Sequence, residues 1–130
     1  MRREAAFPPW MRLRNGAAFR RVFAKGVRLS GPLFVLLALE NAHGHDRLGL
    51  TVSRRVGGAV SRNRARRLLR EGFRRRLSRP GGRGLDLVVL AARALTEQGQ
   101  EEVDRELAER LRRIERKIEE RRRHPSPDAR

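Results

Sequence analysis

The first hydrophobic pattern in the chain has the period of a helix. Phe19 and Phe23 lie one turn apart, Asn15 is a favoured residue at helix starts, and Gly26 is a favoured residue just after helix ends. We therefore predict a short helix over about 16–25, with aromatic side chains on one side and arginines on the other.

Further apolar runs have the length and pattern of strands. Leu33–Leu39 is continuously apolar, which is typical of a buried strand, whereas apolar residues alternate with glycine and threonine over Leu48–Val52. The polar loop Asn41–Arg47 is expected to join these two strands as a hairpin. Leu85–Ala91 is the last predicted strand, and Val27–Leu29 is a candidate for a short additional one.

Two longer helices are predicted from residues at helical spacing. The first covers about 59–78, and its apolar arc consists of Ala65, Leu68, Leu69, Gly72, Phe73 and Leu77. The second begins beyond Thr96 and is amphipathic. Its core-facing stripe consists of Val103, Leu107, Leu111, Ile114 and Ile118.

The order of these elements indicates the fold class. A strand, a helix and another strand in succession imply a parallel pair within an otherwise antiparallel sheet. We therefore predict an α+β domain, with a mixed, mostly antiparallel sheet of three to four strands and about three helices. Residues 12–120 are expected to form this domain, residues 1–11 a flexible extension, and residues 121–130 a disordered, basic, proline-containing tail.

The charge is distributed unevenly along the chain. The net charge is +17; residues 1–95 hold 22 basic and five acidic residues, and residues 96–130 hold ten of each. A positive field on the folded part favours nucleic acid as partner. The longest apolar run is too short to span a membrane. The absence of cysteine excludes disulfides and thiolate metal sites and fits a cytoplasmic setting.

A ridge of basic side chains covers one side of the helix predicted over 59–78. Its candidate binding residues are Asn63, Arg64, Arg66, Arg67 and Arg70, together with Arg62, which helical spacing places over the apolar arc at the start of the helix. Cations near a helix N-terminus are unfavourable by about 0.3–1 kcal/mol each, and Glu71 is the one acid nearby. A bound polyanion would supply the missing charge. The alternative is a solvated helix surface, although such surfaces usually mix both signs.

A second candidate surface combines aromatic and basic residues. It consists of Phe19, Phe23, Phe34, Ser53, Arg54 and Arg55. Aromatic rings beside basic side chains hold single-stranded RNA by base stacking. The alternative is that the three rings belong to the hydrophobic core.

Residues suited to protein-based catalysis are few. His43 and His45 lie in a loop without carboxylate or thiol partners, and His124 lies near the end of the chain. No pair of acids is placed as a metal-dependent nuclease requires. The pattern is that of a binding protein without catalytic residues of its own.

The stretch from Gly49 to Glu71 resembles the signature of the bacterial ribonuclease P protein subunit. The motif Arg62-Asn63-Arg64 is followed by Arg66-Arg67, aliphatic residues, and Arg70-Glu71. The upstream helix with Phe19 and Phe23 is also similar to that family, and the resemblance covers most of residues 12–120. One departure is Leu37, where the family often has an aromatic residue.

The resemblance implies a compact α+β domain with a left-handed crossover around the arginine-rich helix. It implies the catalytic RNA of ribonuclease P and precursor tRNA as partners, not DNA or a membrane. It also implies that the RNA, with Mg²⁺, performs the endonucleolytic removal of the 5′ leader from precursor tRNA. The ridge would contact the catalytic RNA, and the aromatic surface would be a cleft that holds the leader. Two alternatives stay open: a structural ribosomal-type RNA-binding protein, and a protein nuclease that needs no RNA.

Overall fold

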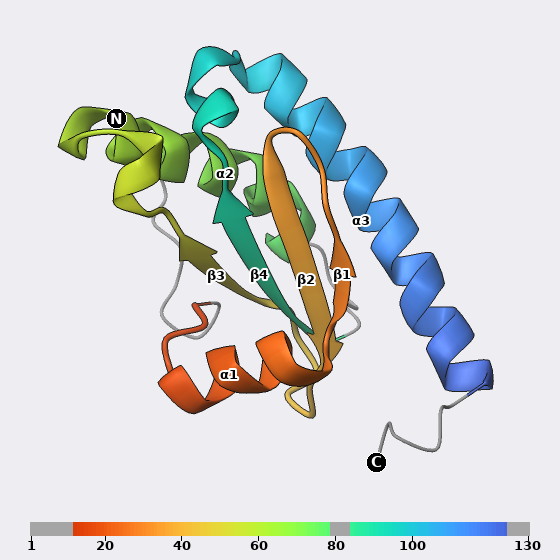
Figure 1. The fold of residues 1–130 in the computed structure, drawn as a ribbon. Helices are drawn as coiled ribbons and strands as arrows, with labels where there is room; N and C mark the ends of the chain where they lie inside the picture. The colour runs from red at the N-terminus through yellow and green to blue at the C-terminus, as the bar shows by residue number, and fades with distance from the viewer. Residues whose placement is uncertain (1–11, 79–83, 125–130) are drawn as a thin grey trace.

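The computed structural model describes residues 12–78 and 84–124, with the side chains of residues 75–78 left out. Figure 1 shows a four-stranded sheet with a short helix on one face and two longer helices on the other. The described elements, in chain order, are α1 (Gly16–Lys25), β1 (Val27–Leu29), β2 (Phe34–Glu40), β3 (Arg47–Thr51), η2 (Arg54–Val56), α2 (Ala59–Ser78), β4 (Leu85–Ala91), η3 (Arg93–Glu97) and α3 (Gln100–Arg123).

The strand order is β1-β2-β4-β3, with β3 and β4 parallel and the other pairs antiparallel. The predicted parallel pair is therefore confirmed, but the predicted hairpin between β2 and β3 is wrong. β4 lies between these two strands and pairs with both. Its side chains are buried on both faces from Leu85 to Val89, and such a strand belongs at the centre of a sheet.

The β3–α2–β4 crossover has the hand that the resemblance implied. In Figure 1, β3 lies to the left of β4, both strands point upward, and α2 passes behind the sheet between them. This arrangement is left-handed, whereas nearly all such crossovers are right-handed.

The sheet separates two hydrophobic clusters. The larger one packs α2 and α3 against the side of β2 and β4 that carries Leu36 and Leu87. The smaller one packs α1, through Ala18 and Val22, against Leu37 and Val88 on the opposite side. Alternation along each strand therefore decides which helices a side chain meets.

Helical spacing predicted the buried stripes of α2 and α3. The five predicted stripe residues of α3 are all buried. On α2, Ala65, Leu68, Leu69 and Phe73 are buried, and the side chain of Leu77 lies outside the described part. Gly72 marks a close approach between the helices, because a Cβ at this position would lie 2.2 Å from Cδ1 of Leu107.

A buried ion pair fixes the sheet beneath α1. Asp86 on β4 is fully buried, and both its carboxylate oxygens accept hydrogen bonds from Arg47 on β3 at 2.8 Å. Asn41 donates a further hydrogen bond to Asp86, and Arg21 of α1 lies 3.8 Å from it. The pair thus joins the two parallel strands below the helix.

The helix ends agree with the predicted capping. The side chain of Asn15 accepts a hydrogen bond from the backbone N–H of Ala17 at 2.7 Å, as an N-cap should. At the other end of the chain α3 continues to Arg123, three residues beyond the predicted domain boundary. The predicted extension over 1–11 and the last residues of the predicted tail, 125–130, lie outside the described residues. Within the described part, no helix is long and apolar enough to cross a membrane.

Candidate nucleic-acid interface

The predicted ridge lies on the side of α2 that faces away from the sheet. Asn63, Arg67 and Arg70 are exposed, whereas Arg66 is partly buried and donates a hydrogen bond to Oδ1 of Asn63 at 3.1 Å. This contact orients one guanidinium and one amide of the motif relative to each other. The exposed residues are placed to meet a polyanion.

Arg64 differs from the other ridge residues because its guanidinium binds the protein itself. Nε donates to the carbonyl of Thr96 at 3.1 Å, and a terminal nitrogen donates to the carbonyl of Gln98 at 2.8 Å. These carbonyls belong to η3 and the residues that lead into α3. Arg64 therefore holds the η3 segment against α2, and we no longer expect it to be a primary phosphate contact.

Replacing Arg64 with alanine is expected to lower the free energy of unfolding by about 2–4 kcal/mol, because two charge-assisted hydrogen bonds are lost. Arg67→Ala, on the exposed side of the same helix, is the matched control and should change it by less than about 0.5 kcal/mol. Urea unfolding followed by circular dichroism measures both. Equal stability of the two variants would show that the Arg64 contacts contribute nothing.

Arg62 is partly buried, and its Nε is shielded from solvent without a hydrogen-bond partner in the described part of the chain. The helix α2 contacts both η2 and η3.

The acidic residues that the structure describes before η3 are all engaged. Glu40 pairs with Arg122, Asp46 accepts from the backbone N–H of Leu85, Glu71 pairs with Arg74, and Asp86 pairs with Arg47. These are all the acids of residues 12–78 and 84–95. None of them neutralises Arg62, Arg66 or Arg67.

The second candidate surface lies on the α1 side of the sheet. Phe19 is partly buried and packs over β3, where a Cβ on Gly49 would lie 2.4 Å from the ring. Glycine at this position therefore makes room for the ring. Val35 on β2 and Leu90 on β4 are paired neighbours and partly exposed beside it. Phe23, one turn further along α1, is 47% exposed. We call these residues the α1-side surface.

Phe34 does not belong to this surface, which corrects the predicted leader cleft. It is 1% exposed and packs in the larger cluster with α2 and α3, on the other side of the sheet. Strand alternation explains the error, since Phe34 shares a face with Leu36, whereas Val35 and Leu37 face α1. Leu37, at the position where the family often has an aromatic residue, is 2% exposed under α1.

The residues after β3 connect the two candidate surfaces. Ser53, Arg54 and Arg55 are exposed, and Oγ of Ser53 accepts a hydrogen bond from the backbone N–H of Arg55 at 3.3 Å. Neither arginine has a carboxylate partner among the described residues. The uncharged residues 56–61 then lead into Arg62 and the ridge on α2, so the two basic groups are adjacent along the chain.

A model of the family described as Ribonuclease P matches residues 7–115. The chain belongs to the ribonuclease P protein family. Membership places it among the protein components of an enzyme of tRNA processing.

Individual members of the ribonuclease P protein family agree in sequence and in fold. The ribonuclease P protein component of Nitrosococcus oceani is 41% identical over 90 residues, which cover 68% of this chain and 74% of that protein. The solved structure of the RNase P protein from Thermotoga maritima matches with a TM-score of 0.69 and 35% identity, covering 79% of this chain and 96% of that one. The Staphylococcus aureus RNase P protein matches with a TM-score of 0.70 and 29% identity, covering 78% and 93%. The predicted fold class is thereby confirmed.

Proposed function

We propose that this chain assists the catalytic RNA of ribonuclease P in removing the 5′ leader from precursor tRNA. The ridge on α2, without the inward-facing Arg64, binds the RNA subunit. The α1-side surface, with the exposed Ser53–Arg55 segment, binds the single-stranded leader. The observation that carries the proposal is that η2 connects the two surfaces directly along the chain. A protein that bridges the enzyme RNA and its substrate needs both binding sites close together.

The proposal assigns hydrolysis to the RNA subunit and its Mg²⁺ ions. Among the described residues, no three His, Cys, Asp or Glu side chains group closely enough to hold a metal ion. The protein's share is to bind the leader and to lower the repulsion between two phosphate backbones through its arginines.

Replacing Phe23 with alanine tests the leader role. Base–aromatic stacking contributes about 1–3 kcal/mol per base, so the affinity of the reconstituted holoenzyme for precursor tRNA should fall about 5- to 150-fold. Its affinity for mature tRNA should stay the same. Because Phe23 is 47% exposed, the fold should be less affected than by Phe19→Ala. The control for general damage to this side of the sheet is Leu39→Ala. Leu39 is also partly exposed and apolar, and it packs in the smaller hydrophobic cluster.

The same assay separates the proposal from its alternatives. If wild-type holoenzyme binds precursor and mature tRNA equally well, the leader role is wrong and a structural RNA-binding role is favoured. If the purified protein cleaves precursor tRNA at the correct site without RNA, catalysis belongs to the protein.

A further inference from the structure

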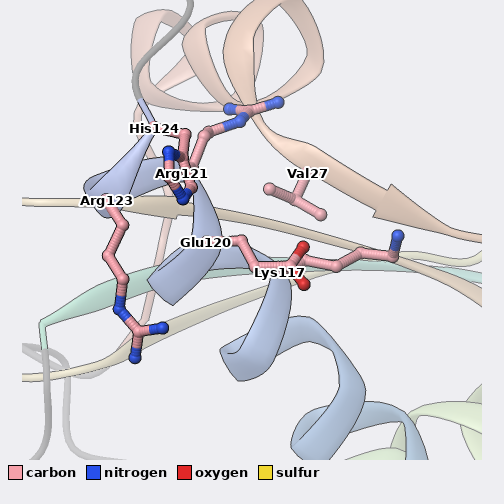
Figure 2. A pocket seen from close by; sticks show the side chains of 6 residues that line it. All are labelled: Val27, Lys117, Glu120, Arg121, Arg123 and His124. Atoms are coloured by element: carbon pink, nitrogen blue, oxygen red, sulfur yellow. The ribbon is translucent and has the colours of Figure 1, made fainter.

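A basic groove lies at the edge of the sheet where three segments meet. It has a volume of about 660 Å³ and is open to solvent between β1 and the last two turns of α3. Figure 2 shows its lining residues, which are Val27, Lys117, Glu120, Arg121, Arg123 and His124. Val27 forms the floor, and the side chain of Arg121 reaches toward the end of α1.

Two arginines of the last turn of α3 hold the groove in shape. Arg121 donates a hydrogen bond to the backbone carbonyl of Lys25, the last residue of α1. Arg122 pairs with Glu40 at the end of β2, and the hydrogen bond to Glu40 together with its charge raises the pKa of this guanidinium. The end of α3 is thus fixed to both α1 and the sheet.

Two further cations, Lys117 and Arg123, line the groove. Lys117 and Arg123 are exposed, and neither has a carboxylate partner among the described residues. Glu120 is the single acid in the lining. The carboxylates of α3 that do form ion pairs bind other arginines, such as Arg110 through Glu106 and Arg113 through Glu109. The groove therefore keeps an excess of positive charge.

Stabilisation of the helix end explains only part of this charge. Cations in the last turn of a helix interact favourably with its dipole, which accounts for Arg121, Arg122 and Arg123. The effect falls off within one turn, so it does not account for Lys117.

We propose that this groove binds backbone phosphates of the RNA leader. The nucleotides concerned are those of the leader that extend beyond the α1-side surface. The proposal rests on the proposed leader role of that surface. Phe23 lies two residues before Lys25, and α1 ends at the groove, so an RNA strand that follows α1 toward its C-terminus arrives between β1 and α3 (Figure 1). Lys117 and Arg123 then each neutralise a phosphate.

The test compares two precursor tRNAs that differ only in leader length. The short leader covers the α1-side surface, and the long leader extends it by about six nucleotides. Wild-type holoenzyme is expected to bind the long-leader substrate several-fold more tightly. The Lys117→Ala/Arg123→Ala variant should lose this difference, and the slope of log K against log salt for the long leader should become shallower by about 1.4. The matched control is Arg105→Ala/Arg112→Ala, which removes two exposed arginines from α3 outside the groove lining.

Three results would overturn the proposal. The first is wild-type binding that does not depend on leader length. The second is an unchanged length dependence in the groove variant, and the third is an equal loss in the control variant, which would indicate general charge attraction. Failure of the leader role itself is distinguishable, because then even the short leader would give no advantage over mature tRNA.

Discussion

A chain with Arg66, Arg67 and Arg70 replaced by alanine is expected to bind the catalytic RNA on the order of a hundredfold more weakly at physiological salt. Each phosphate contact contributes about 0.7–0.9 to the slope of log K against log salt, so three lost contacts reduce the slope by about 2–3. Arg67 and Arg70 are exposed and Arg66 is partly buried, so urea unfolding of the variant is the control for folding. Filter binding to the RNA subunit over a range of salt concentrations measures the effect.

The control for this experiment removes the same charge from another helix. Arg105, Arg112 and Arg116 are exposed on α3 and have no carboxylate partner among the described residues. Their replacement by alanine lowers the net charge equally. If both triple variants give the same salt slope, the RNA responds to total charge, and the ridge on α2 is not a specific interface.

The largest expected effect on stability comes from Arg47→Met. The substitution leaves Asp86 fully buried without the two hydrogen bonds that its carboxylate accepts from Arg47. Breaking a buried ion pair from one side costs about 3–5 kcal/mol. Since a domain of this size has about 5–15 kcal/mol of stability, this loss should clearly lower both unfolding midpoints. Thermal and urea unfolding, compared with the unmodified protein, measure the loss.

The double variant Arg47→Met/Asp86→Leu shows whether the loss comes from the unpaired charge. Replacing both members by apolar residues removes the buried carboxylate, so stability should recover by at least about 1 kcal/mol relative to Arg47→Met. A double variant less stable than the single one would mean that Asp86 acts mainly through Asn41 and Arg21, its other contacts.

Local sequence patterns predicted the elements well because each pattern has a local cause. The helix α1 begins after the Asn15 cap and ends before Gly26, where a Cβ would lie 2.6 Å from the carbonyl oxygen of Val22. The pairing of the strands was harder, because loop length suggested a hairpin, while burial on both faces placed β4 at the centre. The 3₁₀ segments η2 and η3 depend on tertiary contacts and left no periodic signal.

The candidate site was predictable as a charge pattern, but not in its detailed roles. Helical spacing placed Arg64 on the ridge, yet its contacts with Thr96 and Gln98 depend on a segment 32 to 34 residues away in sequence. Phe34 was assigned to the leader surface by residue type, although alternation along β2 was available to exclude it. The groove at the end of α3 left no motif, because it forms only where Val27 of β1 meets the cations of this helix end.

The central place of β4 has a consequence for the nascent chain. In the part of the chain that the structure describes, β3 pairs with β4 and with the short segment around Arg12 alone, and β2 gains its second neighbour when residues 85–91 have been synthesised. Contacts between segments this far apart form late and slowly. While the ribosome is still adding the first two thirds of the polypeptide, the arginine-rich helix α2 therefore emerges without a finished sheet to fold against. Its final packing waits for the translation of residues 85–91.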